Sequence, residues 1–253
     1  MLHLVKKAAI VATLAALGSM APVQAAQKCE LNGKFDFGKY WLENNQWNRN
    51  SVSNLGNSWQ CVWYNKYNSR TDCEFGWQWN WVKDNGQIKA YPYVGTWKNG
   101  LPVQLSANKN ILLDWKFWVS TAGRFNCSWD IWISGSTSDT APATAEIMIW
   151  TYRNGDYVTP SGTYQTTVNL AGANWEVWKG RESSGNQSWD YLAFVRTTNQ
   201  TWTENMNLKE FTDYLRNRGW LNSSHYIHQI HAGSELFEGE GWLHTYGFRA
   251  DVQ

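Results

Sequence analysis

Along most of the chain, short runs of alternating apolar and polar residues are separated by clusters of Gly, Asn, Ser and Asp. Such runs are typical of antiparallel strands with one face on a core. The run at 125–133, FNCSWDIWI, is an example. One predicted face carries Phe125, Cys127, Trp129, Ile131 and Ile133, and the other carries Asn126, Ser128, Asp130 and Trp132. The first face predicts a core, and the second face predicts a surface with another task.

A single carboxylate interrupts the otherwise apolar run at 145–150, AEIMIW. An unpaired charge buried in a core is costly, or the group gives up its charge. Alternation places Ala145, Ile147 and Ile149 on the core face and Glu146, Met148 and Trp150 on the opposite face. Glu146 therefore belongs to the second face, where other groups can compensate it. Similar runs at 163–170, 174–180, 190–196 and 242–252 predict further strands.

Only residues 207–219, NLKEFTDYLRNRG, break this pattern. Leu208, Phe211 and Leu215 recur at helical spacing, and Asn207 with Glu210 resembles a capping box. Gly219 follows a basic last turn, as at many helix C-termini. We therefore expect an all-β fold, a sandwich with one packed helix.

The first 25 residues predict a secretory signal peptide. Lys6 and Lys7 precede an apolar run, and small residues at 23–25 fit a cleavage site. No later segment approaches the length of a membrane span. The chain contains no internal repeat or low-complexity linker, so we expect a single domain at 26–253 in a secreted, extracellular protein with no membrane partner.

Four cysteines, Cys29, Cys61, Cys73 and Cys127, fit an oxidising destination. Their wide spacings do not resemble a zinc site, so disulfides are expected. Three connectivities are possible, and the sequence alone does not choose among them. We favour Cys29 with Cys61 and Cys73 with Cys127.

The composition excludes one class of binding partner and favours another. Nucleic-acid binding usually requires an excess of positive charge, and a net charge of +1 does not provide it. The chain holds 19 tryptophans and 12 tyrosines, and flat aromatic faces on a secreted protein favour stacking on sugars. A Trp-rich core or an adhesive surface would also use these residues.

A second carboxylate like Glu146 lies in HQIHAGSELFEGEGW at 228–242. Alternation puts Glu235 on one face with His231 and ahead of a turn expected at Gly239. If the strands of Glu146 and Glu235 are neighbours, the two carboxyl groups form the pair that glycoside hydrolysis requires. Asp130 shares the second face and is expected to orient Glu146 by a hydrogen bond. Rival acids Glu238 and Glu240 are expected to be exposed in the turn.

These residues carry a resemblance to a known family. The segments AEIMIW at 145–150, WDIW at 129–132, HAGSELFEG at 231–239 and PSGTYQTTVNLAGANWEVWKG at 160–180, with the single helix before the last strands, resemble glycoside hydrolase family 12. The similarity covers essentially the whole chain after residue 25. It implies a β-jelly-roll sandwich of two curved antiparallel sheets with one packed α-helix and a concave substrate cleft, and no cofactor or metal.

The resemblance also implies residue roles. Glu146 would be the nucleophile of a retaining endo-β-1,4-glucanase and Glu235 the acid and base, with Asp130 as the partner of the nucleophile. NNQWN at 44–48 resembles the substrate-binding segment of the family, so Asn45 and Trp47 are expected to bind substrate, and Met148 is expected to line the cleft. Cys29 and Cys61 resemble the N-terminal disulfide of the family. The chain departs from the family pattern at 160–162 and at 234–236, which affects loop shape and subsite preference.

Further substrate contacts are expected from Trp132, Trp150 and His231. His225, His228 and His231 recur every third residue, but on a strand this spacing alternates faces, so structural or cleft-lining histidines are favoured over metal ligands. Soluble β-1,4-glucans are the favoured substrate, and a monomer is expected. Two alternatives remain: a xyloglucan-specific endo-β-1,4-glucanase on the same fold, and a non-catalytic sugar-binding module.

Overall fold

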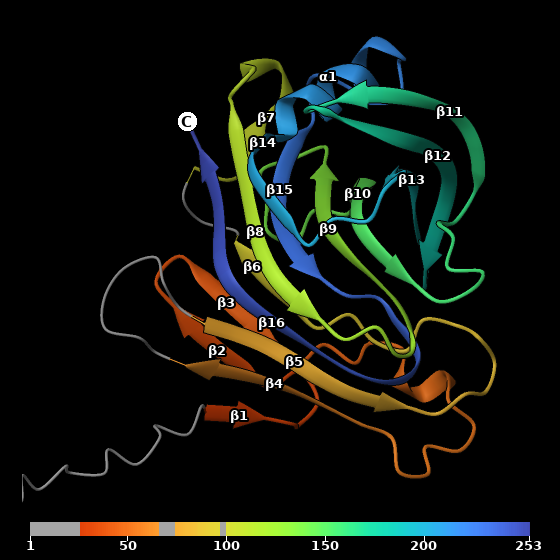
Figure 1. Cartoon of the computed structure of the whole chain (residues 1–253). Coiled ribbons are helices and arrows are strands. Elements are labelled where there is room, and N and C mark those ends of the chain that lie inside the picture. The colour runs from red at the N-terminus through yellow and green to blue at the C-terminus, as the bar shows by residue number, and fades with distance from the viewer. Residues whose placement is uncertain (1–25, 66–73, 97–99) are drawn as a thin grey trace, which may run out of the picture.

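The computed structural model describes residues 26–65, 74–96 and 100–253. The expected signal peptide at 1–25 and Cys73 lie outside these residues. The described chain forms two packed layers of β-strands, as predicted, with one α-helix against them. The fold is the expected jelly roll, a nearly closed sandwich of two curved sheets (Figure 1).

The first layer, sheet A, has the strand order β1-β4-β5-β16-β8-β14. Its strands are β1 (Ala26–Lys28), β4 (Trp59–Asn65), β5 (Glu74–Trp81), β8 (Ile111–Val119), β14 (Trp202–Asn207) and β16 (Leu236–Val252). All of these pairs are antiparallel.

The second layer, sheet B, has the order β2-β3-β6-β15-β9-β10-β13-β12-β11. Its strands are β2 (Lys34–Phe37), β3 (Tyr40–Glu43), β6 (Tyr93–Thr96), β9 (Arg124–Ser134), β10 (Ala143–Asn154), β11 (Thr163–Leu170), β12 (Ala173–Ser184), β13 (Gln187–Arg196) and β15 (Tyr226–Gly233). The short β7 (Val103–Gln104) pairs with the start of β15. The pair of β10 and β13 is parallel, which differs from the expected all-antiparallel arrangement.

The long strand β16 joins the two sheets. Its first residues pair with β9 in sheet B, and from Gly239 onward it pairs with β5 and then β8 in sheet A (Figure 1). The turn expected at Gly239 is therefore wrong. Gly239 has a φ of 88° and lies against Gly123, where a Cβ atom would be 2.6 Å from the Gly123 Cα, so the strand bends there without ending.

This course of β16 also corrects the expected exposure of Glu238. Its side chain is buried, and its Oε1 lies 3.7 Å from Arg124 Nη1 and 3.9 Å from Lys83 Nζ. Glu240 is exposed, as expected. Because two cations face Glu238, its burial needs no catalytic explanation.

The predicted core faces are confirmed. All five residues assigned to the core face of 125–133 and all three assigned in 145–150 lie in the main hydrophobic cluster. Tryptophans fill much of this cluster: the Trp115 ring contacts Trp129 edge-on, with centroids 6.0 Å apart, and lies tilted to Trp77, with centroids 6.3 Å apart. A Trp-rich core therefore accounts for part of the unusual composition.

Helix α1 (Leu208–Asn217) forms where the helical spacing predicted it, and buries Leu208, Phe211 and Leu215. Asn207 caps the helix by accepting a hydrogen bond from Lys209 N at 3.1 Å. The capping box is incomplete, because the Glu210 carboxylate accepts from Ala171 N instead, in the β11–β12 turn. Gly219 has a φ of 70°, as a helix-ending glycine should.

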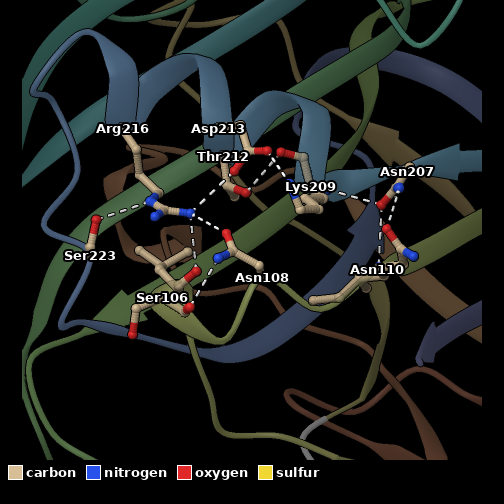
Figure 2. Close-up of polar contacts among 11 residues, drawn as sticks. Ser106, Asn108, Asn110, Asn207, Lys209, Thr212, Asp213, Arg216 and Ser223 are labelled. Carbon is tan, nitrogen blue, oxygen red and sulfur yellow. Dashed lines mark hydrogen bonds and ion pairs between the residues drawn. The ribbon is translucent and has the colours of Figure 1, made fainter.

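The described residues include two 3₁₀ turns, η1 (Arg49–Ser51) and η2 (Leu105–Ala107), and polar contacts fasten α1 to η2 and to the residues after it (Figure 2). Arg216 donates to Asn108 Oδ1 at 2.8 Å, to Leu105 O at 3.2 Å and to Ser223 Oγ at 3.0 Å (Figure 2). Asn207 donates to Asn110 Oδ1 at 2.9 Å and accepts from Ile111 N at 3.3 Å. The N-terminal end of the helix is thus held at the start of β8, and its C-terminal end at residues 105–108, just before β8.

The predicted disulfide between Cys29 and Cys61 is present and ties β1 to β4. The predicted pairing of Cys73 with Cys127 is wrong, because Cys127 is a free thiol. Its side chain points into the core between the sheets and lies 3.5 Å from Ser234 Oγ, in a fully buried position. In the part of the chain that the structure describes, no helix is long and apolar enough to cross a membrane.

The capping contacts of Asn207 lead to a stability prediction. Asn207→Ala should lower the free energy of unfolding by about 1–2 kcal/mol, because a helix cap and a bond to β8 are lost together. Asn207→Asp keeps the acceptor oxygen and should lose less. Urea unfolding of the three proteins measures this, and equal midpoints for the alanine variant and the unsubstituted protein would contradict it.

Candidate active site

The central strand of the site is β9, which lies between β10 and β15 in sheet B. The register places Asp130 of β9 opposite Met148 of β10 on one side and opposite His231 of β15 on the other. Glu146 lies in the adjacent row, opposite Trp132. The second face predicted from alternation thus brings these residues together, although their strands are far apart in sequence.

Glu235 lies in the short connection between β15 and β16, opposite Asn126 of β9. Asn126 donates from its side-chain amide to Glu235 Oε2 and accepts from Glu235 N at 3.2 Å, and its own backbone N donates to Glu235 O at 3.1 Å. Ser128 Oγ supports the amide by donating to Asn126 Oδ1 at 3.2 Å. One fully buried side chain therefore fixes both the backbone and the carboxyl group of Glu235.

The approach of Tyr91 to this connection requires a glycine. A Cβ atom at Gly233 would lie 2.8 Å from Tyr91 Cζ and 2.6 Å from Pro92 O. Tyr91 donates from its hydroxyl to Ser128 O at 3.0 Å. Burial raises the pKa of Tyr91, and the carboxyl groups of Asp130, Glu235 and Glu146 raise it further. All three acids are therefore within electrostatic reach of one ring.

Glu146 is half-buried, and its Oε2 accepts a hydrogen bond from Trp189 Nε1 at 2.7 Å. Trp189 of β13 contacts Trp132 edge-on, with ring centroids 5.5 Å apart. Trp132 in turn donates from Nε1 to Asp130 Oδ2 at 2.9 Å. Two indole N–H groups thus support the two neighbouring acids.

The ionisation of the three acids is set by burial and by one another. Burial raises the pKa of Glu235 to about 8; the hydrogen bond from Asn126 opposes this rise, and the charges of Glu146 and Asp130 add to it. Burial raises the pKa of Asp130 to about 7, against the bond from Trp132. Burial and then the charge of Asp130 raise the pKa of Glu146 above its ordinary range, although Trp189 lowers it. The cluster therefore retains protons at neutral pH.

The expected hydrogen bond from Asp130 to Glu146 is absent among the contacts of the described residues. Asp130 Oδ1 is buried and has no hydrogen-bond partner, while Oδ2 is bound by Trp132. The link between the two acids is electrostatic: a charge on Asp130 raises the pKa of Glu146, so the two acids do not ionise independently. A protonated Asp130 would have one oxygen available to donate.

His231 lies beside Asp130 as a buried, neutral ring. Its Nδ1 lies 3.7 Å from Asp130 Oδ2, and its ring stacks on Tyr93 with centroids 4.2 Å apart. Burial lowers the pKa of His231 to about 3, so the contact with Asp130 is not an ion pair at neutral pH. Gly95 makes room for this packing, since a Cβ there would lie 2.9 Å from His231 Cδ2.

The residues expected to contact substrate fall into an exposed or half-buried group and a buried group. The Trp47 ring is 60% exposed, and Trp132 and Asn45 are half-buried. Met148 and Trp150 are 2% and 1% exposed and lie in a cluster beneath the second face. Tyr191 donates to Met148 Sδ at 3.3 Å. Met148 and Trp150 thus form a floor under the acids, and Trp47 presents a free ring.

The sequence analysis did not assign a role to Asn126, Trp189, Tyr91 or Tyr191. The signal for Asn126 was present, because alternation had placed it on the second face with Asp130. Alternation in 187–196 likewise puts Trp189 and Tyr191 on one face. Only the pairing of β13 with β10 shows which acid they meet.

Within the described ranges, no group of three or more His, Cys, Asp and Glu side chains is arranged to hold a metal ion. His225 Nδ1 is 2.9 Å from Thr144 Oγ1, and His228 Nε2 is 2.5 Å from Ser136 O. Each of these two histidines therefore contacts a residue in the segment 134–144, and the two are not paired with each other. The chemistry available at the site is acid, base and nucleophilic chemistry of carboxyl groups.

Comparisons with known proteins agree with this chemistry. Residues 38–253 match the model of the family described as glycosyl hydrolase family 12. Endoglucanase S of Pectobacterium parmentieri is 32% identical, over 93% of this chain and 90% of its own length. Xyloglucan-specific endo-beta-1,4-glucanase A of Emericella nidulans is 26% identical, over 90% of this chain and 91% of its own. The solved family 12 xyloglucanase from Bacillus licheniformis is 31% identical, with a TM-score of 0.80 over 90% of this chain and 100% of that one.

The contacts of Asn126 generate a prediction about Glu235. Asn126→Ala should raise the pKa of the Glu235 carboxyl group by roughly one pH unit, because the removed amide N–H stabilises the charged form. Ser128→Ala is the matched control, because it loosens Asn126 without removing its amide, and should shift the pKa less. Carboxyl ¹³C chemical shifts followed through a pH titration measure both, and an unchanged or lower pKa in the Asn126 variant would contradict the assignment.

Proposed function

Because the chain belongs to glycosyl hydrolase family 12, we propose that it is an endo-acting enzyme that hydrolyses internal β-1,4-glucosidic bonds of soluble β-glucans. The single observation that supports this most is the arrangement around β9. A protonated carboxyl group held by Asn126 shares one face of the sheet with the half-buried Glu146 beside Asp130.

In the first step, Glu146 attacks the anomeric carbon and the bond to the leaving oxygen breaks. Glu235 gives its proton to that oxygen, and a covalent glycosyl-enzyme results. A pKa of about 8 keeps Glu235 protonated at neutral pH, as this step needs. In the second step, water attacks the anomeric carbon, its proton passes to Glu235, and the bond to Glu146 breaks.

Asp130 is the proposed partner of the nucleophile. Two neighbouring buried acids retain one proton between them, and the nucleophile must be the ionised member. Glu146 is the more solvated of the two, while Asp130 is 5% exposed. We therefore place the proton on Asp130, which can use its unpaired Oδ1 to donate to Glu146 or to a sugar hydroxyl.

The substrate is proposed to lie across the second face of sheet B. Trp47 offers a ring for stacking on a glucosyl unit, Asn45 precedes it by two residues, and Trp132 flanks the acids. Trp150 and Met148 form the floor, and His231 packs beside Asp130. The enzyme acts without a cofactor or metal, as a monomer.

A xyloglucan-specific endo-β-1,4-glucanase is the second candidate. It is favoured by the likeness to the family 12 xyloglucanase from Bacillus licheniformis and to the Emericella nidulans protein. The two candidates share the catalytic residues and differ in whether branched chains are accepted. Substrate ranking separates them.

The expected location is extracellular, through the signal peptide at 1–25. The Cys29–Cys61 disulfide supports an oxidising compartment. Mass spectrometry of the exported protein should give an N-terminus at Ala26.

The proposed nucleophile can be tested on polymers. Glu146→Gln should lower activity by more than about 10⁴-fold while the fold is retained, because no covalent intermediate can form. Viscosity loss and reducing-sugar release are compared on carboxymethylcellulose, mixed-linkage β-glucan and xyloglucan. Preference for the first two supports the glucanase, and preference for xyloglucan supports the second candidate. No release from any of them by the folded unsubstituted protein would leave only a sugar-binding module.

The two roles of Glu235 can be tested with an aryl β-cellobioside that has a good leaving group. Glu235→Ala should still form the glycosyl-enzyme, because this substrate needs little acid assistance, but should hydrolyse it about 10²–10⁴-fold more slowly. Added azide needs no base and should restore turnover, giving a β-glycosyl azide. Glu146→Ala is the contrasting variant and should give the α-azide. A β product from Glu146→Ala would reverse the assignment.

A further inference from the structure

The outer face of sheet A carries aromatic side chains that the catalytic site does not use. They are Trp59, Trp63, Trp118, Trp202, Trp242 and Tyr246, and all except the half-buried Trp63 are between 39% and 54% exposed. In β8 the inward positions are buried, and the outward Trp118 alternates with them. Large apolar side chains gathered on one face of a soluble protein indicate a binding surface.

The strand register places part of this group in one line. Trp63 of β4 is opposite Gly76 of β5, Gly76 is opposite His244 of β16, and His244 is opposite Trp118 of β8. Strands in a sheet lie about 4.8 Å apart, so the line from Trp63 to Trp118 crosses three spacings, roughly 14 Å. This length suits a few consecutive units of an extended polymer better than a single small molecule.

The rings in this line are fixed by one another. Trp63 and Trp118 each contact the His244 ring edge-on, with centroids 5.0 Å apart, and Tyr246 stacks on Trp118 at 4.5 Å. Gly76 allows Trp63 to lie across β5, because a Cβ there would be 2.8 Å from the Trp63 ring. Rings held in advance lose little conformational entropy when a ligand stacks on them.

Ion pairs occupy the cations of this face. Lys116 Nζ lies 3.5 Å from Glu204 Oε1, and Arg249 Nε lies 2.7 Å from Asp114 Oδ2. The face therefore offers aromatic rings without an excess of positive charge. This complements an uncharged polymer with apolar sugar faces, and it gives no attraction to a polyanion or to an anionic lipid surface.

We propose that the outer face of sheet A is a second, non-catalytic binding surface for a β-glucan chain. The core between the sheets separates it from the second face of sheet B, where the acids lie, so a chain bound here is not the chain being cleaved. The surface would hold the enzyme on insoluble or entangled polysaccharide while the site acts on a neighbouring chain. The choice of a β-glucan as ligand rests on the proposed function.

The experiment uses the Glu146→Gln protein, which does not consume the polymer. Its binding to regenerated amorphous cellulose is measured by depletion from solution, with and without Trp118→Ala and Trp202→Ala together. Removing both rings should weaken binding by about tenfold. Trp118→Tyr, which keeps a ring, should retain most of the affinity, and Leu31→Ala, which removes a 56% exposed apolar side chain in a turn, should have no effect.

Two further measurements separate this surface from the catalytic site. Binding of cellotetraose by calorimetry and turnover of a short aryl cellobioside should be unchanged by the two tryptophan substitutions.

Equal retention on cellulose with and without Trp118 and Trp202 would overturn the proposal. So would a concentration-dependent dimer that the substitutions abolish, since the occupant would then be a second copy of the chain. If Glu146→Gln leaves polymer hydrolysis intact, the proposed function fails, while the loss of cellulose binding still reports on this surface.

Discussion

The position of β9 between β10 and β15 is the constraint on which the site depends. This one strand contributes Asp130 and Asn126, and its two neighbours bring Glu146 and Glu235 to it. A slip of one residue in either pairing would turn the side chains of the slipped strand to the other face. The buried core face of β9, with Phe125, Trp129 and their alternating neighbours, prevents such a slip, because a slipped strand would place apolar rings in water and acids in the core. The hydrophobic core thus sets the geometry of the acid cluster.

Burying several acids on one face carries an electrostatic cost. Hydrogen bonds limit it: Asn126 holds Glu235, Trp189 holds Glu146 and Trp132 holds Asp130. Retained protons limit it further, since burial raises the pKa of each acid. The same desolvation that costs stability keeps the proposed general acid Glu235 protonated at neutral pH, so the proposed functional state and the energetic cost have one cause.

The tryptophans serve three environments. Trp77, Trp115 and Trp129 fill the core between the sheets, and Trp132 and Trp189 donate N–H groups among the acids. Others, such as Trp118, lie on the outer face of sheet A. A tryptophan-rich core therefore does not exclude tryptophans on the exposed faces, because the two faces of each sheet use the same residue type differently.

The sequence by itself determined what depends on local periodicity. Alternation assigned Glu146 and Asp130 to the second face, and helical spacing located α1, because the direction of a side chain follows from its place in its own strand or helix. Some predictions from local sequence signals were wrong. Gly239 suggested a turn where β16 continues, Glu210 suggested a capping box, and Cys127 suggested a disulfide where the core holds a free thiol.

Only the tertiary structure decided which strands are neighbours. The partner of Glu235 is Asn126, 109 residues away, and the partner of Glu146 is Trp189, 43 residues away. Such contacts depend on the strand order and register of a sheet assembled from distant segments, and no local pattern encodes them. The residues of the site could be nominated from the sequence, but their contacts, and with these the ionisation of the acids, follow from the long-range packing of β9 against its neighbours.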